Sequence, residues 1–118
     1  MKLFVYGTLR EGQMRSSVLS RSKYLGQIKT KPQYTMISLV AFPGLIDNGE
    51  TAVVGDLYEV DKMTLTHTDM IEGHPNFYVR SKVELEDGTI AHAYFLPEDE
   101  YGMRPMIKSG DWLDVGYE

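Results

Sequence analysis

Two acidic residues, Asp69 and Glu72, fall at the end of a segment with helical spacing, where Gly73 and Pro75 stop the helix. A carboxylate near a helix C-terminus meets the negative end of the helix dipole, and partial burial adds to that effect by raising its pKa. A carboxylate in such a place could act as a general base near neutral pH. The alternative, from position alone, is an exposed helical acid with no chemical role.

A second stretch, Tyr6-Gly7-Thr8-Leu9, could bind an anion through its backbone. It follows an apolar strand at residues 2–6 that stops abruptly at the glycine. Glycine lets the chain turn so that successive backbone N–H groups point at one place, which suits a carboxylate. The alternative is an ordinary tight turn between a strand and a loop.

Other chemistries lack the residues they need. The stretch from Gly7 to Gly12 begins like a phosphate loop, but Gln13 stands where the lysine must be. No Gly-x-Ser-x-Gly motif supports a serine hydrolase. The acidic run at residues 98–100 has no apolar neighbours and is typical of a solvated loop.

Metal and thiol chemistry are disfavoured too. The chain has no cysteine, which excludes disulfides, thiolate nucleophiles and cysteine-ligated metals. No two of its histidines have the helical spacing of a zinc site; they are His67, His74 and His92. We therefore expect no metal ion and no cofactor.

Length and composition set the class. A chain of 118 residues predicts one domain spanning residues 1–118, and 42% hydrophobic with 25% charged residues is typical of a globular protein. The net charge of −5 disfavours nucleic acid and anionic membranes as partners. No targeting segment is recognisable at residues 1–8, so we expect a cytoplasmic protein.

The strands and helices that must position the candidate site residues indicate an α+β fold. Strands are expected at residues 2–6, 24–30, 34–40, 52–60, 77–86 and 89–96, and helices at 13–20 and 61–72. Turns are expected at residues 42–44 and 47–50, and Asp87-Gly88 favours a type I′ hairpin. The result is a mostly antiparallel sheet, which could close partly into a barrel.

Two longer motifs extend the stretches described above: Tyr6-Gly7-Thr8-Leu9-Arg10 and Asp69-x-x-Glu72-Gly73-x-Pro75-x-x-Tyr78-x-Arg80. In their order and separation these residues resemble the γ-glutamylcyclotransferase-like superfamily, which includes γ-glutamylamine cyclotransferases. Shorter matches are Tyr34-x-Met36, Pro43-Gly44, residues 54–60 and Ser109-Gly110-Asp111-Trp112. Thr68 departs from the leucine that commonly precedes the aspartate, which affects helix packing.

The resemblance implies a small mixed, mostly antiparallel β-barrel flanked by short helices, with a pocket between the Tyr-Gly-Thr-Leu turn and the end of the glutamate-bearing helix. It also implies a reaction on a small-molecule γ-glutamyl substrate, an amine, amino acid or peptide. The free α-amine attacks the γ-carbonyl, 5-oxoproline forms, and the attached amine leaves without any cofactor or metal.

The resemblance also implies roles for individual residues. Glu72 would be the general acid and base. Backbone amides of Gly7, Thr8 and Leu9 would bind the substrate α-carboxylate, and Tyr6 would line the pocket.

Three further residues have two possible roles each. The hydroxyl of Tyr78 would orient the substrate, or the ring would simply pack in its strand. Arg10 and Arg80 would face the substrate or pair with Asp69 or Glu11.

A second function class fits the same residues: a binding module of this fold that holds a glutamyl-like ligand or a protein partner without turnover. Glu72 favours the enzyme, because a pure binder has no chemical need for a carboxylate at that place. The leaving amine and the oligomeric state are left open.

Overall fold

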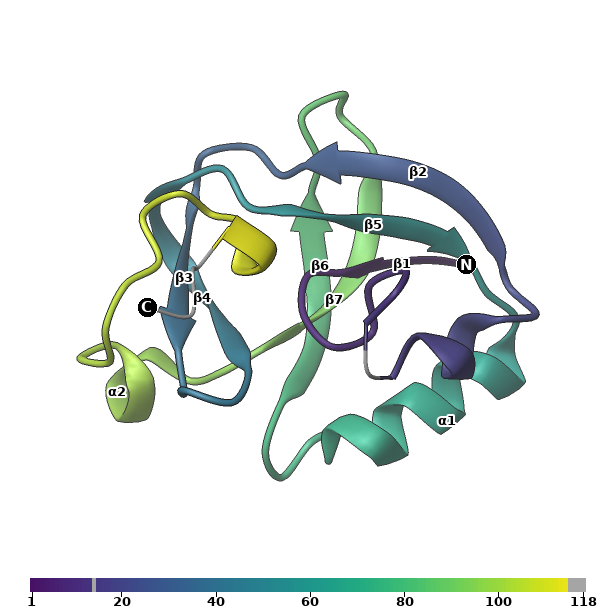
Figure 1. Cartoon of the computed structure of the whole chain (residues 1–118). Coiled ribbons are helices and arrows are strands. Elements are labelled where there is room, and N and C mark those ends of the chain that lie inside the picture. Colours follow the sequence, from purple (N-terminus) through teal and green to yellow (C-terminus); the bar gives the residue numbers. More distant parts are fainter. Residues whose placement is uncertain (14, 115–118) are drawn as a thin grey trace.

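The computed structural model describes residues 1–13 and 15–114 and contains two sheets (Figure 1). The larger sheet has five strands in the order β2-β5-β1-β7-β6, and the smaller pairs β3 with β4. The strands are β1 (Lys2–Val5), β2 (Lys23–Lys29), β3 (Tyr34–Ser38), β4 (Pro43–Thr51), β5 (Val54–Glu59), β6 (Val79–Glu84) and β7 (Ile90–Phe95). The helices are α1 (Lys62–Glu72), α2 (Glu98–Tyr101) and the 3-10 turns η1 (Ser16–Leu19) and η2 (Trp112–Asp114).

The predicted α+β class with a mixed, mostly antiparallel sheet is confirmed, but the sheet is curled and open rather than a closed barrel. Strand β1 runs parallel to β7, and the other neighbours in both sheets are antiparallel. The two edges approach each other only at one end, where an isolated bridge joins Thr30 to Leu85. Twist brings these strand ends together without pairing the rest of the edge strands β2 and β6.

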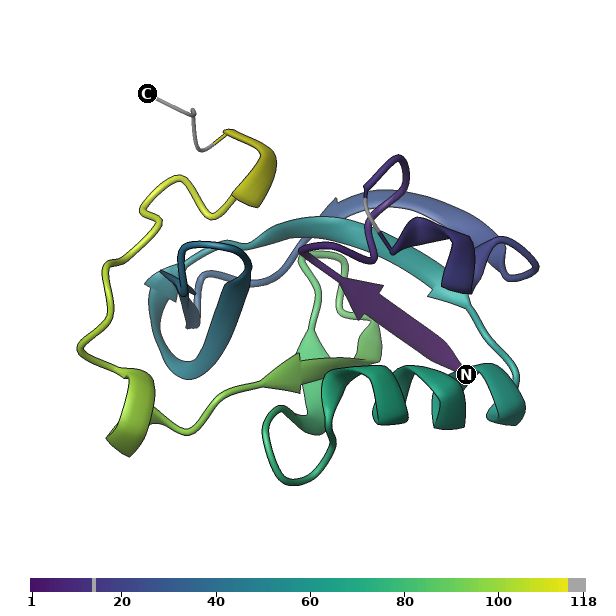
Figure 2. The same ribbon diagram turned by 60° about the horizontal axis from the view of Figure 1, so that its bottom comes forward.

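Strand β1 lies at the centre of the sheet and is apolar on both faces, as its sequence predicts. Phe4 packs into one core cluster, while Leu3 and Val5 pack into the other, on the opposite face. Helix α1 covers the second cluster with Leu65 and runs beneath β1 (Figure 2). The chain therefore leaves the middle of the core directly into the Gly7 turn.

Helix α1 has the predicted boundaries. The carboxylate of Asp61 caps its start by accepting a hydrogen bond from the Thr64 N–H at 2.7 Å. Gly73 ends it with φ 69°, in the left-handed region that favours glycine. Glu72 is thus the last residue of the helix.

Two turn predictions are wrong in detail. Residues 47–50 lie within β4 as a bulge, since Tyr34 pairs with Thr51 and the next residue, Thr35, pairs with Ile46. The chain reverses before residue 43, where the Leu39 N–H bonds the Phe42 carbonyl, so Pro43-Gly44 begins a strand instead of a turn.

Two local predictions also need correction. The hairpin between β6 and β7 does turn at Asp87-Gly88, but Leu85 pairs with Thr89 and only Gly88 has a positive φ. This is a wider loop than the two-residue type I′ turn, which needs a positive φ at both central residues. Within the helix predicted at residues 13–20, the described residues 13 and 15–20 form only the 3-10 turn η1, and residue 14 lies outside the described residues.

Candidate functional site

A cavity of about 320 Å³ opens where the turn after β1 meets the end of α1 and the start of β4. Every residue that the sequence analysis assigned to the pocket lines this cavity, apart from the two arginines. Arg10 and Arg80 do not line it. The lining residues are Phe4, Val5, Tyr6, Gly7, Thr8, Leu9, Arg15, Ala41, Phe42, Pro43, Ile71, Glu72, Phe77, Tyr78 and Tyr94.

The Gly7 turn is held tightly against the start of β4. A Cβ on Gly7 would lie 2.9 Å from Cγ of Pro43, so only glycine lets the two segments approach so closely. The turn is closed by the Arg10 N–H, which donates to the Gly7 carbonyl at 3.0 Å. Within residues 1–13 and 15–114, the N–H groups of Thr8 and Leu9 make no hydrogen bond, which leaves both donors for a bound anion.

Glu72 presents the only carboxylate among the described residues that line the cavity. Its partial burial raises the pKa of the carboxyl, and the positive charge of Arg15 opposes that rise. Its side chain forms no hydrogen bond or ion pair with another residue in the described part of the chain. The carboxylate is therefore free to exchange a proton with a bound molecule.

Two tyrosine hydroxyls tie the walls of the cavity together. The Tyr6 hydroxyl donates to the Tyr94 carbonyl at 2.5 Å, and the Tyr78 hydroxyl donates to the Pro43 carbonyl at 2.6 Å. Burial raises the pKa of both tyrosines, so both stay protonated and remain donors. Tyr78 thus forms part of the wall, and its proton is directed to the backbone in this structure.

Arg80 pairs with Asp69, one of the alternatives open from the sequence. Its Nε lies 2.8 Å from Oδ1 of Asp69, and its Nη1 lies 3.1 Å from Nδ1 of His92. Burial alone would raise the pKa of Asp69, but hydrogen bonds from Arg80 and Tyr94 hold it below its ordinary value. The pair joins the last turn of α1 to β6 behind the cavity.

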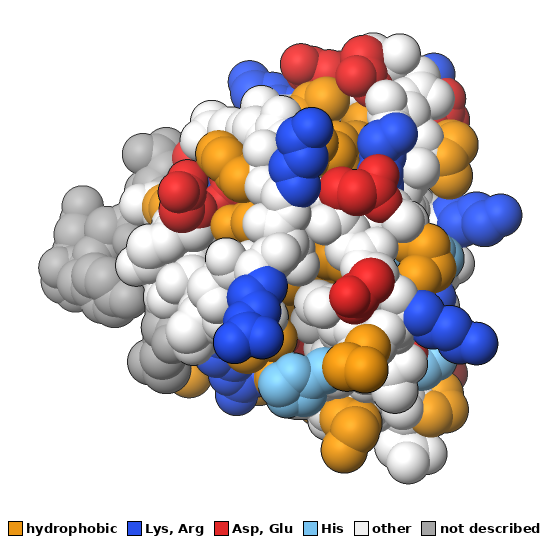
Figure 3. All heavy atoms as spheres, turned by 90° about the vertical axis from the view of Figure 1, so that its right-hand side faces the viewer, with side chains coloured by type: hydrophobic (Ala, Val, Ile, Leu, Met, Phe, Trp, Pro, Cys, Tyr) orange, Lys and Arg blue, Asp and Glu red, His pale blue; other side chains and the backbone are white. Residues whose placement is uncertain are grey.

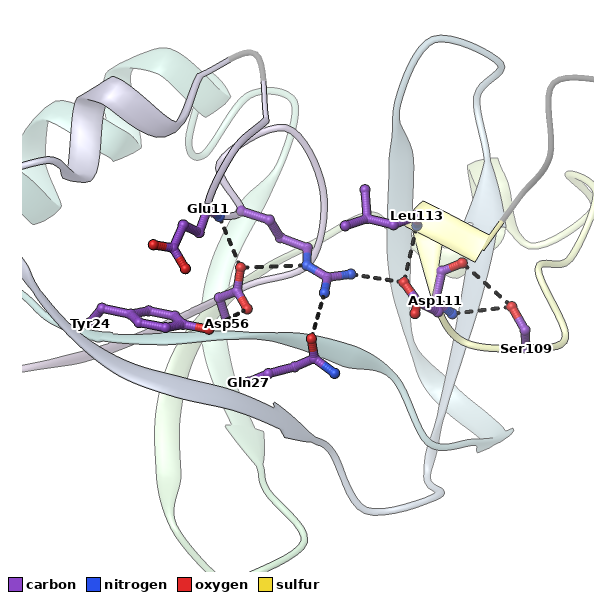
Figure 4. Close-up of polar contacts among 8 residues, drawn as sticks. Glu11, Tyr24, Gln27, Asp56, Ser109, Asp111 and Leu113 are labelled. Carbon is purple, nitrogen blue, oxygen red and sulfur yellow. Dashed lines mark hydrogen bonds and ion pairs between the residues drawn. The ribbon is translucent and has the colours of Figure 1, made fainter.

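Arg10 turns away from the cavity into a buried polar cluster and pairs with neither Asp69 nor Glu11. Its Nη1 lies 2.8 Å from Oδ1 of Asp111, and its Nε lies 3.5 Å from Oδ2 of Asp56. The two carboxylates approach the guanidinium from opposite sides (Figure 4). Asp56 also accepts the Glu11 N–H at 2.9 Å, so the cluster anchors the chain directly after the turn.

Several lining residues were not predicted. Arg15 follows the turn closely enough that its proximity could have been inferred. Phe77 and Tyr94 reach the cavity through the loop after α1 and the parallel pairing of β7 with β1. No local pattern in the sequence signals those approaches.

Three further features of the described residues bear on possible partners: surface charge, metal ligands and membrane-spanning helices. Acidic and basic side chains are interspersed on the face shown in Figure 3. No group of three or more His, Asp or Glu side chains in the described part of the chain is arranged to hold a metal ion. Among the described helices, none has both the length and the apolar character of a membrane span.

The fold and the cavity define a class: a small α+β protein whose curled mixed sheet brings a glycine turn and one partly buried carboxylate into the lining of the same cavity. A model of the family described as "Gamma-glutamyl cyclotransferase, AIG2-like" matches residues 3–114. The chain belongs to this family and is a γ-glutamylcyclotransferase-like enzyme.

Individual relatives agree with the family. A protein of this family from Vibrio cholerae is 39% identical over 110 residues, which cover 93% of each chain. YtfP of Escherichia coli, a gamma-glutamylcyclotransferase family protein, is 33% identical, and its solution structure covers 97% of both chains with a TM-score of 0.73. The crystal structure of a mouse AIG2-like protein is 27% identical with a TM-score of 0.75, covering 93% of this chain and 87% of the mouse chain.

Proposed function

We propose that this chain converts a γ-glutamyl amine, amino acid or peptide to 5-oxoproline and releases the amine. The observation that carries the proposal is Glu72, a carboxylate with a raised pKa that lines the same cavity as Thr8 and Leu9, whose amides have no partner among the described residues. A base and an anion site are the two groups that this reaction needs. The family supports the reaction class, and the cavity supports the assignment of the groups.

The proposed steps use no group from outside the chain and the substrate. The amides of Thr8 and Leu9 donate to the substrate α-carboxylate and hold the glutamyl chain folded. Glu72 accepts a proton from the α-ammonium, and the freed amine nitrogen attacks the γ-carbonyl carbon. Glu72 delivers that proton to the leaving nitrogen as the bond from the carbon to this nitrogen breaks. Glu72 then takes the second proton from the former α-nitrogen, which leaves the neutral lactam, and passes it to the released amine, which departs as an ammonium ion.

The remaining predicted residues shape this site. Gly7 permits the close turn, and Leu9 packs into the core beneath it. Tyr6 and Tyr78 hold the walls through their bonds to backbone carbonyls. Because the reaction is intramolecular, a rigid wall that selects the folded glutamyl chain accelerates it.

The test is production of 5-oxoproline, measured by mass spectrometry, from γ-glutamyl amines, γ-glutamyl amino acids and γ-glutamyl peptides. Wild type is compared with Glu72→Gln and with Glu100→Gln, which makes the same change at an exposed glutamate outside the cavity lining. We expect Glu72→Gln to lose roughly 10²–10⁴-fold in turnover and Glu100→Gln to keep wild-type turnover. Wild-type turnover in Glu72→Gln would overturn the role of Glu72.

The competing function is a binding module. It predicts that 5-oxoproline or a glutamate analogue raises the melting temperature of the wild-type protein while no γ-glutamyl compound is consumed. The absence of a hydrogen-bond partner for Glu72 among the described residues favours the enzyme, since a carboxylate that serves only structure is normally paired when partly buried.

A further inference from the structure

Arg15 is the only cation among the described residues that line the cavity, and the proposed reaction does not use it. Its backbone N–H donates to the Thr8 carbonyl at 2.8 Å, which folds the loop back beside the turn. Arg15 is an exposed residue, so it lies at the mouth of the cavity rather than at its base. Its charge acts on Glu72 and Tyr78, lowering the pKa of each, so the guanidinium lies within electrostatic reach of both.

Three of the apolar residues that line the cavity are also exposed or half-buried: Ala41, Phe42 and Phe77. The rings of Phe42 and Phe77 meet edge to face with centroids 6.1 Å apart. Phe77 keeps 36% of its surface exposed, although large apolar side chains are usually more fully buried. One cation beside an exposed aromatic pair fits a molecule that carries both an anion and an apolar group.

We propose that the leaving group is an apolar amino acid or a peptide that begins with one, whose carboxylate binds Arg15 and whose side chain packs on Phe42 and Phe77. This inference rests on the proposed function and adds the class of leaving group. For a peptide leaving group, the anion that binds Arg15 is the C-terminal carboxylate, and the peptide must be short enough for this carboxylate to reach the mouth of the cavity.

The position of Glu72 sets the direction in which the leaving group must extend. In the proposed reaction Glu72 exchanges a proton with both the α-amine and the leaving nitrogen, so the γ-carbonyl carbon lies beside it. The glutamyl α-carboxylate occupies the amides of Thr8 and Leu9. The leaving group therefore extends from Glu72 toward the mouth, where Arg15 and the aromatic pair lie.

The test uses two substrates that differ only in one carboxylate: γ-glutamyl-L-phenylalanine and γ-glutamyl-phenethylamine. Values of kcat/KM are measured for wild type, Arg15→Met, Arg15→Lys and the control Arg21→Met, which changes an exposed arginine outside the cavity lining. γ-Glutamyl-L-alanine serves as a third substrate that keeps the carboxylate and removes the ring. Thermal unfolding shows that each variant is folded.

We expect wild type and Arg21→Met to prefer the phenylalanine compound over the amine by about tenfold or more, because a charge-assisted hydrogen bond adds selectively to that substrate. Arg15→Met should bring the ratio near one by slowing only the phenylalanine compound, and Arg15→Lys should restore part of it. High salt should reduce the wild-type ratio, since the arginine is exposed. The alanine compound should react more slowly than the phenylalanine compound.

Other outcomes overturn the inference in distinguishable ways. An equal loss for both substrates in Arg15→Met would show that Arg15 acts on the glutamyl part that they share. A wild-type ratio near one would exclude recognition of a leaving-group carboxylate. No 5-oxoproline from any substrate with folded wild type would overturn the proposed function itself, and this inference with it.

Discussion

Oδ1 of Asp69 lies 2.8 Å from Nε of Arg80, and this ion pair ties the last turn of α1 to β6. The same oxygen accepts the Tyr94 hydroxyl at 2.7 Å, which Thr68 also contacts. Asp69 is one helical turn before Glu72, so these contacts fix the helix end that carries the proposed base. Tyr94 also lines the cavity, so the Asp69 network supports one of its walls.

We expect Asp69→Asn to lower stability in a pH-dependent way. The pKa of Asp69 is lowered in the folded state, so its contribution is present above the pKa of the unfolded chain and is lost as pH falls through the folded pKa. In urea unfolding, the free energy of unfolding of wild type should therefore exceed that of Asp69→Asn by about 1–3 kcal/mol at neutral pH, and this gap should close in acid. The control is Asp99→Asn, an exposed residue, which should show no gap. A gap that does not change with pH would contradict the assignment.

Arg10 should act through the turn that it anchors. Arg10→Met leaves the nearly buried carboxylate of Asp56 without its cation, which we expect to cost about 3–5 kcal/mol of unfolding free energy. Arg10→Lys should recover only part, because one ammonium cannot reach both Asp56 and Asp111 with the geometry of a guanidinium. Asp111→Asn should cost less, since Asp111 keeps 28% of its side-chain surface exposed.

The effect of Arg10 on activity separates support from direct binding. If Arg10 only holds the turn, Arg10→Lys should raise KM for γ-glutamyl substrates and leave kcat nearly unchanged once substrate is saturating. A large fall in kcat at saturation would instead indicate that the arginine contacts the reacting atoms.

Gly7→Ala should impair both substrate binding and folding. Its Cβ would lie 2.9 Å from Cγ of Pro43, and the proline ring and the Tyr78 bond to its carbonyl resist displacement. We expect the turn to shift and KM to rise about tenfold, with a stability loss of about 1–3 kcal/mol. Gly12→Ala is the matched control: its φ of 80° strains alanine, but nothing lies near its Cβ. It should lower stability and leave KM unchanged.

The elements built from local signals were predictable. Asp61 and Gly73 marked both ends of α1, and the glycine after β1 marked the turn that lines the cavity. Glu72 could be placed at the helix end for the same reason. The family resemblance, based on residues in both stretches, predicted that they meet in one pocket.

Contacts between distant segments could not be read from local patterns. The bulge at residues 47–50 depends on how β4 pairs with β3, and its Asp-Asn-Gly-Glu sequence is equally typical of a turn. Arg10 pairs with Asp56 and Asp111, which only the folded chain brings beside it. Charge and spacing along the chain favoured nearer acidic residues, so the sequence did not indicate these two partners of Arg10.

The pH dependence of kcat/KM should report Glu72 directly. The reaction needs its ionised form, and burial raises its pKa above the ordinary value of 4.5, so the acidic limb of the profile should lie above that of an exposed carboxyl. Arg15 opposes this rise, so Arg15→Met should move the limb to higher pH, whereas Arg21→Met should not. γ-Glutamyl-phenethylamine is the suitable substrate, because it has no leaving-group carboxylate for Arg15 to bind.

The contribution of Glu72 to stability should change with pH in the opposite direction to activity. A raised folded-state pKa means that the native protein binds the proton more tightly than the unfolded chain. The contribution of Glu72 is therefore fully present below the unfolded pKa and is lost as pH rises through the folded pKa. Over that pH interval, the free energy of unfolding of Glu72→Gln should rise relative to that of wild type, while its turnover is lower. If both the acidic limb and this gain are absent, Glu72 is not the group that exchanges the proton.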